Sequence, residues 1–153
     1  MRGQAGGHII NISSGNAVVR LPFSSYYVAS KCALEGFSSC LRRELRPLGV
    51  QVSVIAPTFL KSGISDTIQM GAEPIDAYEP WKTMWQEAIQ RSVRRAADPQ
   101  LVAGCVALIL RSLRPRELYL VGTGLRLARW ARRWLPENLF YWGMAKALRA
   151  KAK

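Results

Sequence analysis

The stretch that decides the fold is residues 8–31, HIINISSGNAVVRLPFSSYYVASK. Its first part, His8 to Ser13, is apolar and ends in small polar residues, which predicts a buried strand that leads into a loop. Residues 14–25 contain a glycine and a proline, which predicts that the whole segment is a loop. From about residue 26 to residue 45, apolar side chains recur every four positions and predict an amphipathic helix. Its stripe consists of Ala33, Phe37 and Leu41, with Leu34 and Leu45 beside it.

The rest of the chain continues this alternation of strands and helices. Residues 50–56, VQVSVIA, and residues 117–121, ELYLV, predict two further strands. Between them, residues 81–95 predict one helix, and Asp98 with Pro99 predicts the capped start of another that runs to about residue 113. This order of elements predicts an α/β fold with a parallel sheet and right-handed crossovers.

Composition and charge bound the class of protein. The chain has 153 residues, of which 49% are hydrophobic and 21% charged, and this is enough for one globular domain with a core. A formal net charge of +12 suits proteins that bind nucleic acid or an anionic membrane, and also proteins with a solvated basic face. Because no zinc finger, recognition helix or aromatic-basic RNA motif accompanies the charge, we expect no nucleic-acid partner.

Cysteine usage and the apolar runs bear on the compartment. The three cysteines and the single histidine have no metal-like spacing, so we expect free thiols in a reducing compartment and no metal site. The longest apolar run, residues 101–110, is about half the length that spans a bilayer, and the start MRGQAGGHII lacks the apolar segment of a signal peptide. We therefore expect an intracellular protein, cytoplasmic or peripherally membrane-associated, and not a secreted one.

Three residues of the opening stretch carry a coherent chemistry. Tyr27 and Lys31 are four positions apart and share one face of the predicted helix. A free phenol has a pKa of about 10, but a neighbouring ammonium favours the phenolate, so such a tyrosine can act as a general acid or base. Ser14 follows the carboxyl end of a strand, where open α/β sheets bind ligands, and its hydroxyl can hydrogen-bond the reacting oxygen. Ser13 and Tyr26 compete for these roles, and only spacing excludes them.

These motifs together resemble a known enzyme family. The sequence NISS, then Pro22 and YVASK, resembles the active-site segment of the short-chain dehydrogenase/reductases, and the similarity continues through ALEGFSSCLRREL and GVQVSVIAP. It is strong over residues 8–62, weak over 63–95 and moderate beyond, and it looks closest to the branch of retinol, hydroxysteroid and 3-hydroxybutyrate dehydrogenases. The resemblance implies the C-terminal part of a Rossmann-like, doubly wound parallel sheet. It also implies an NAD- or NADP-dependent oxidoreductase for a secondary alcohol or ketone, or for an apolar alcohol or aldehyde such as a steroid, retinoid or acyl chain.

The resemblance also assigns roles by position. Ser14 would bind the substrate and polarise its oxygen, Tyr27 would transfer the proton, and Lys31 would assist Tyr27 and hydrogen-bond the nicotinamide ribose. The resemblance also assigns Tyr27 and Pro57, which follows the second strand, to the cofactor site. The backbone near Leu60 and the hydroxyl of Ser62 would hold the nicotinamide carboxamide and the phosphates. Thr58 stands where the family has a glycine, and it restricts the backbone there.

Several family features are absent from the sequence. No Gly-x-x-x-Gly-x-Gly loop occurs, and the start MRGQAGGHIINISS resembles an internal stretch of family members. We therefore expect that the N-terminal dinucleotide-binding half is missing and that this truncated chain is inactive alone. The choice between NAD and NADP stays open. The alternative is a non-catalytic interaction module that pairs with a full-length subunit or a membrane surface. In family dimers the helix at 26–45 packs against its counterpart, so a homo-oligomer through this helix is expected, while its apolar stripe also suits a plain core.

The final segment differs from the rest. We divide the chain into a partial catalytic domain, residues 1–122, and basic amphipathic helices, residues 123–153, split at Leu135–Pro136. Their apolar stripes are Leu127, Trp130 and Trp134, then Phe140, Met144 and Leu148, and the cations beside them are Arg126, Arg129, Arg133, Lys146, Arg149, Lys151 and Lys153. Residues 125–153 suit a peripheral contact with anionic lipid, or else packing on the domain with solvated arginines. The loop at 62–80 and the aromatics Tyr78, Trp81 and Trp85 suit a lid over an apolar substrate, or packing against the sheet.

Overall fold

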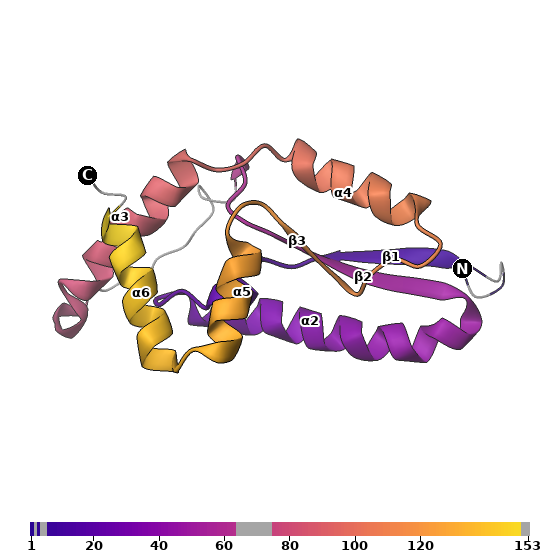
Figure 1. The fold of residues 1–153 in the computed structure, drawn as a ribbon, viewed down its shortest axis with the longest axis horizontal. Helices are drawn as coiled ribbons and strands as arrows, with labels where there is room; N and C mark the ends of the chain where they lie inside the picture. The colour runs from indigo at the N-terminus through magenta and orange to yellow at the C-terminus, as the bar shows by residue number, and fades with distance from the viewer. Residues whose placement is uncertain (2, 4–5, 64–74, 151–153) are drawn as a thin grey trace.

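A computed structural model describes residues 1, 3, 6–63 and 75–150 of the protein, the last three of them by backbone only. Three parallel strands form its sheet in the order β1 (Gly7–Ile12), β2 (Val50–Pro57) and β3 (Leu118–Val121) (Figure 1). Ile9 pairs with Val52, and Ile55 pairs with Tyr119. The predicted α/β fold with a parallel sheet is therefore confirmed.

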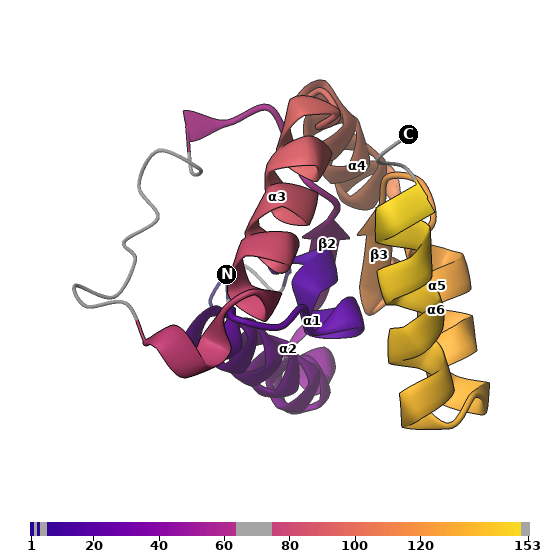
Figure 2. The same cartoon turned by 90° about the vertical axis from the view of Figure 1, so that its left-hand side faces the viewer.

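Helices cover both faces of this sheet. The long helix α2 (Ser25–Leu45) connects β1 to β2, and α3 (Trp81–Arg94) and α4 (Gln100–Arg111) connect β2 to β3. Figures 1 and 2 show α2 and α4 on opposite sides of the strands. In the part of the chain that the structure describes, short 3₁₀ turns lie at Arg46–Leu48 and at Asp76–Tyr78. Before α4 the Asp98 carboxylate accepts a hydrogen bond from the Gln100 amide at 2.8 Å, which is the expected capping contact.

The core is centred on the middle strand. Val52, Val54 and Ile55 of β2 are buried, and Ile109 of α4 packs into the core with no exposed surface. A strand covered on both faces must be apolar at consecutive positions, which explains the continuous run in its sequence. The exception, Ser53, is buried but donates a hydrogen bond to the Arg116 carbonyl oxygen at 2.8 Å, so its hydroxyl is satisfied.

The loop predicted over residues 14–25 is wrong in its first part, because Gly15–Val19 form a short helix, α1. The Ser14 hydroxyl caps this helix by accepting a hydrogen bond from the Asn16 amide at 3.1 Å. The turn ends where Arg20 adopts a left-handed conformation with φ of 54°, and the Asn16 side chain accepts from the Leu21 amide at 2.7 Å. Local side-chain capping therefore makes a helix that is too short to produce a periodic pattern.

The apolar stripe predicted on the long helix is covered only in part. Leu34, Leu41 and Leu45 are half-buried, whereas Ala33 and Phe37 are exposed, Phe37 by 59%. Polar contacts also attach α2 to the sheet: the buried Ser38 hydroxyl accepts from the Asn11 side chain at 2.8 Å. Further along, Arg42 donates to the carbonyl oxygens of Val52 and Pro115. The plain-core interpretation of this stripe is therefore wrong for Ala33 and Phe37.

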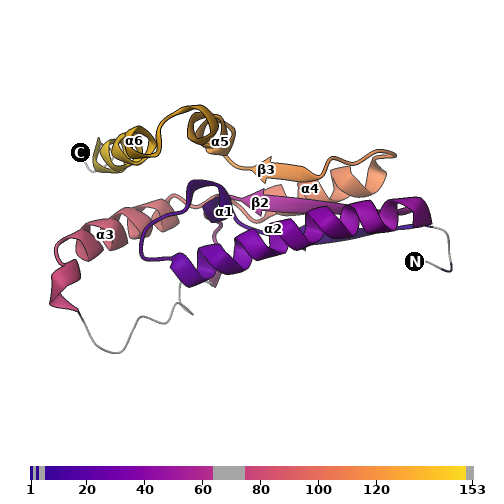
Figure 3. The same ribbon diagram turned by 90° about the horizontal axis from the view of Figure 1, so that it is seen from below.

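Two helices end the chain beyond the β3 edge, α5 (Leu125–Trp134) and α6 (Glu137–Ala150) (Figures 1 and 3). They separate at Leu135–Pro136, as the sequence predicts. Leu125 and Phe140 are buried, and Arg132 donates to the Val18 carbonyl oxygen of α1 at 2.8 Å. Among the helices that the structure describes, none has the length and apolarity that crossing a bilayer requires.

Candidate functional site

The candidate site lies where the parallel strands end. Ser14 and α1 follow β1, residues 58–62 follow β2, and α5 follows β3. Gly15 lets these segments approach one another, because a side-chain carbon there would lie 2.7 Å from Leu125 Cδ2 and 3.1 Å from the Pro57 carbonyl oxygen. The carboxyl edge of a parallel sheet is the usual position of a ligand in such folds.

Lys31 connects this edge to the predicted catalytic tyrosine. Its Nζ donates a hydrogen bond to the Ile12 carbonyl oxygen at 3.2 Å, and the same atom lies 5.7 Å from the centre of the Tyr27 ring. An ammonium has three donors, so two stay free for a ligand after the bond to Ile12. Tyr27 is 39% exposed and therefore accessible to a ligand.

Ser14 brings a hydroxyl to the same edge. Its backbone is extended, with φ of −153° and ψ of 148°, and its half-buried side chain accepts the capping bond from Asn16 described above. In that role the oxygen serves as acceptor, and no acceptor among the described residues takes its hydrogen. The hydroxyl can therefore donate to an oxygen of a bound molecule.

Ser13 and Tyr26 were the alternatives to Ser14 and Tyr27, and their surroundings in the structure differ from those of the predicted pair. Ser13 is buried, and its hydroxyl donates to Glu35 Oε1 at 2.8 Å. Tyr26 is 93% exposed, so its side chain points into solvent. Glu35 and Asn16 were not predicted as site residues. Glu35 could have been found from its spacing, because it lies four positions after Lys31 and so on the same side of the helix.

The residues predicted to hold a cofactor are not all brought together. Pro57 is buried at the end of β2, next to α1. Leu60 instead forms an isolated bridge with Ala97, whose carbonyl oxygen accepts from the Lys61 amide at 2.9 Å. Ser62 is exposed, and its amide donates to the Leu60 carbonyl oxygen at 2.9 Å. Ser62 therefore follows this bridge in the chain.

Thr58, which stands where the family has a glycine, lies beside a glycine that follows β3. Its amide donates to the Val121 carbonyl oxygen at 2.9 Å. Its hydroxyl occupies the space beside Gly122, where an added side-chain carbon would lie 2.1 Å from Thr58 Oγ1. Gly122 has a φ of 105°, a conformation that favours glycine. Bulk at Thr58 is therefore accommodated by the absence of a side chain at Gly122.

The predicted lid falls largely outside the described residues, at 64–74. Of its aromatics, Trp85 is buried, whereas Tyr78 and Trp81 are more than half exposed. The Tyr78 ring meets Phe23 edge-on, with 6.0 Å between ring centres. Phe23 belongs to the turn just before α2, so these rings form an apolar wall close to the start of the helix that carries Tyr27.

Comparisons with known proteins agree with this geometry. A family model described as short chain dehydrogenase matches residues 1–72. The chain is 32% identical over 156 residues to the uncharacterized oxidoreductase YusZ of Bacillus subtilis, covering 99% of this chain and 54% of the relative. It is also 32% identical over 149 residues to 17-beta-hydroxysteroid dehydrogenase type 6 of Rattus norvegicus, covering 89% and 47% respectively.

A solved structure shows the same arrangement of elements. The short chain dehydrogenase/reductase from Burkholderia phymatum in complex with NAD superposes with a TM-score of 0.61 at 26% identity, over 77% of this chain and 44% of that one. The chain spans about half the length of the curated relatives it matches.

Proposed function

The chain belongs to the short-chain dehydrogenase/reductase family, and from this premise we propose that it carries the proton-transfer site of an NAD(P)-dependent oxidoreductase. The observation that carries the proposal is the position of Lys31, bonded to Ile12 at the end of β1 and 5.7 Å from the Tyr27 ring. The Lys31 amine therefore contacts the end of β1 and lies close to the Tyr27 ring, which supports a shared role for the two side chains in the proposed site.

Each residue then has a part in the reaction. The Tyr27 phenol exchanges a proton with the substrate oxygen as general acid or base. Ser14 donates its free hydrogen to the same oxygen, which polarises a carbonyl and orients an alcohol. Lys31, held by the Ile12 carbonyl oxygen, presents positive charge close to the Tyr27 ring during the exchange.

The residues present fit part of a nicotinamide cofactor. The two free donors of Lys31 suit ribose hydroxyls, and the carboxyl edge near Pro57 is the expected position of the ring. The cofactor, when bound, would accept a hydride from the carbon of an alcohol or donate one to the carbon of a carbonyl compound. The Burkholderia phymatum relative has NAD bound, and we extend to this chain the use of NAD or NADP. Leu60 and Ser62 stay proposed as contacts of its carboxamide and phosphates.

The substrate we propose is an apolar alcohol or carbonyl compound. The name of the rat relative specifies a hydroxysteroid, and the wall formed by Phe23 and Tyr78 offers apolar surface close to the start of α2. We propose a steroid, retinoid or acyl-like molecule in which the oxidised or reduced carbon lies within reach of Tyr27. Burial of the apolar part against these rings favours binding by about 25 cal/mol per Å² of surface removed from water.

The experiment uses a chimera that joins the N-terminal half of the Bacillus subtilis relative to this chain, because the 153-residue sequence contains no glycine loop for the pyrophosphate. We expect Lys31→Ala to lower kcat about 100-fold or more. Lys146→Ala is the matched control, because Lys146 is exposed on α6 and its Nζ lies 5.1 Å from the centre of the Trp142 ring. Equal kcat values for the two variants, in folded protein, would refute the proposed role of Lys31.

A second candidate, assembly through residues 26–45, is favoured by the outer face of α2. Phe37 is 59% exposed, Ala33 is exposed, and a side chain at Gly36 would meet no atom within 4 Å. We propose that this open apolar face pairs with a second copy or with a full-length subunit. Sedimentation velocity tests it: Phe37→Glu should convert a dimer to a monomer, whereas Glu44→Gln on an exposed position should not.

A further inference from the structure

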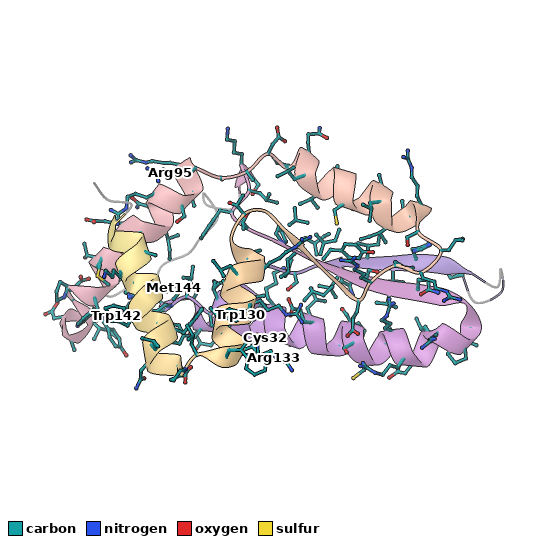
Figure 4. All side chains as sticks on the ribbon, viewed as in Figure 1. Cys32, Arg95, Trp130, Arg133, Trp142 and Met144 are labelled. Atoms are coloured by element: carbon teal, nitrogen blue, oxygen red, sulfur yellow. The ribbon has the colours of Figure 1, made fainter. Side chains whose placement is uncertain are left out.

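A groove of about 860 Å³ lies between α4, β3 and α5, and the proton-transfer site does not use it. Five exposed arginines line it, together with Trp130. Two of them precede β3 and three project from α5, namely Arg114, Arg116, Arg126, Arg129 and Arg133. Figure 4 shows Trp130 and Arg133 on α5.

Among the described residues, none that lines this groove carries a negative charge. Over residues 6–63 and 75–147, the ion pair that the structure contains is Arg91 with Glu87 on α3, at 3.5 Å. The charge of this surface therefore suits an anionic partner. A second copy docked about a two-fold axis would set arginine against arginine, which is unfavourable.

Next to the arginines, α5 presents an apolar face. Leu127, Trp130 and Trp134 are 69%, 60% and 66% exposed, so the first apolar stripe does not pack on the domain. At 100° per residue, this stripe and the arginine row at 126, 129 and 133 are adjacent faces of one helix. The third face, with Leu125 and Arg132, attaches the helix to α1. Attachment by one face leaves both the cationic and the apolar face outward.

The following helix, α6, also carries an exposed tryptophan. Trp142 is 61% exposed, and Lys146 Nζ lies 5.1 Å from its ring centre. The second predicted stripe points inward instead, since Phe140 is 7% exposed and Met144 is half-buried. The prediction that the apolar stripes pack on the domain is therefore confirmed for Phe140 and Met144. It is wrong for the first stripe, Leu127, Trp130 and Trp134. Leu148 and Arg149 have no described side chains, and Lys151 and Lys153 lie outside the described residues.

We propose that α5, the groove beside it and Trp142 form a docking surface for a bilayer that contains acidic phospholipids. Arginine guanidinium groups bind phosphate in bidentate fashion, and each basic residue near such a surface contributes about 1 kcal/mol, or about a fivefold change in affinity. Tryptophan rings prefer the interface between headgroups and acyl chains. The contact is peripheral, with α5 lying in the plane of the interface. This membrane contact would be a role of the proposed C-terminal unit, residues 123–153, and it does not depend on the proposed proton transfer.

The test is co-sedimentation of the full chain with vesicles. We expect binding to phosphatidylcholine vesicles that contain about 30% phosphatidylglycerol, little binding to pure phosphatidylcholine, and weakening as salt is added. The triple variant Arg126→Gln, Arg129→Gln, Arg133→Gln should bind on the order of 100-fold more weakly. The triple Arg→Lys variant at the same positions keeps the charge and should bind within about tenfold of the parent.

A matched control separates a local surface from net charge. Arg46→Gln, Arg94→Gln, Arg95→Gln removes three exposed arginines elsewhere and lowers the formal charge of +12 by the same amount. It should weaken binding less than tenfold. Equal losses in the two glutamine variants, equal binding to both vesicle types, or no binding to either would overturn the proposal. Circular dichroism establishes that each variant is folded, and if the glutamine triple is not, Trp130→Ala with Trp134→Ala takes its place and must weaken binding.

Discussion

The buried Ser13 hydroxyl donates a hydrogen bond to Glu35 Oε1 at 2.8 Å, across 22 positions of sequence. This contact fixes the end of β1 against α2, next to the residues that carry the proposed chemistry. It also commits Ser13 to a structural role and leaves Ser14 as the serine with a free hydrogen. The bond between Ser13 and Glu35 therefore holds the end of β1 on α2. It also leaves Ser14, rather than Ser13, available to donate to a ligand.

Removing this acceptor should destabilise the fold. Glu35→Ala leaves a buried hydroxyl without its partner, so the free energy of unfolding should fall by about 1–3 kcal/mol. The control is Glu44→Ala on the same helix, where Glu44 is exposed and the change should stay within about 0.5 kcal/mol. Urea unfolding followed by circular dichroism measures both. If the two variants lose the same stability, the contact does not fix α2 as described.

The pairing of Thr58 with Gly122 predicts a specific clash. Gly122→Ala should cost more than about 1 kcal/mol, because it combines a φ of 105° with a carbon 2.1 Å from Thr58 Oγ1. Gly124→Ala separates the two causes, since Gly124 also has a positive φ, of 83°, but has open space around it. Thermal unfolding should show the larger loss at Gly122. In a Thr58→Gly background the two losses should become similar, and a persistent difference would argue against the clash.

The sequence predicted the strands because each is an apolar run bounded by turn residues, and α2 because its pattern is long and regular. The spacing of Tyr27 and Lys31 likewise sets a shared helix face, whatever surrounds it. Helix α1 could not be predicted, since five residues are too few for a period and its formation depends on the Ser14 cap. Periodicity also identified the stripe with Phe37 correctly as one face, but a period does not say which face the sheet covers.

The sequence also did not show which face of α5 packs on the domain, because that depends on long-range contacts. Arg132 bonds to Val18 across 114 positions, and this contact attaches α5 by the face opposite its tryptophans. Helical spacing gave the arginine row and the apolar stripe on α5, but not which of its faces the domain covers. The exposure of Trp130 and Trp134 therefore came from the structure alone.

Nucleotide binding tests whether this chain builds a cofactor site of its own. Helix N-termini with glycine loops supply most pyrophosphate contacts in dinucleotide-binding folds, and the sequence contains no such loop. We expect titration calorimetry of the 153-residue chain to show NAD and NADP binding weaker than about 100 μM. Micromolar binding of either would mean that the described edge holds the phosphates by other groups.

Cysteine alkylation tests the packing of α4. Burial raises the pKa of the Cys105 thiol, because the charged thiolate is disfavoured away from water. Since the thiolate is the reactive form, iodoacetamide should label Cys105 more slowly than the exposed Cys40 near neutral pH. The Cys105 rate should go on rising with pH into the alkaline range. Mass spectrometry of the labelled peptides measures the rates, and faster labelling of Cys105 would contradict the described packing.

The most direct test of the proposed proton transfer compares two adjacent tyrosines in the chimera described above. Tyr27→Phe removes the phenol beside Lys31, whereas Tyr26→Phe removes one that is 93% exposed and changes the composition in the same way. Steady-state turnover of an apolar alcohol with NAD or NADP is the measurement. The account predicts that Tyr27→Phe lowers kcat by about 100-fold or more while Tyr26→Phe stays within about twofold of the parent. A Tyr27→Phe enzyme within tenfold of the parent, or an equal loss in both variants, would contradict it.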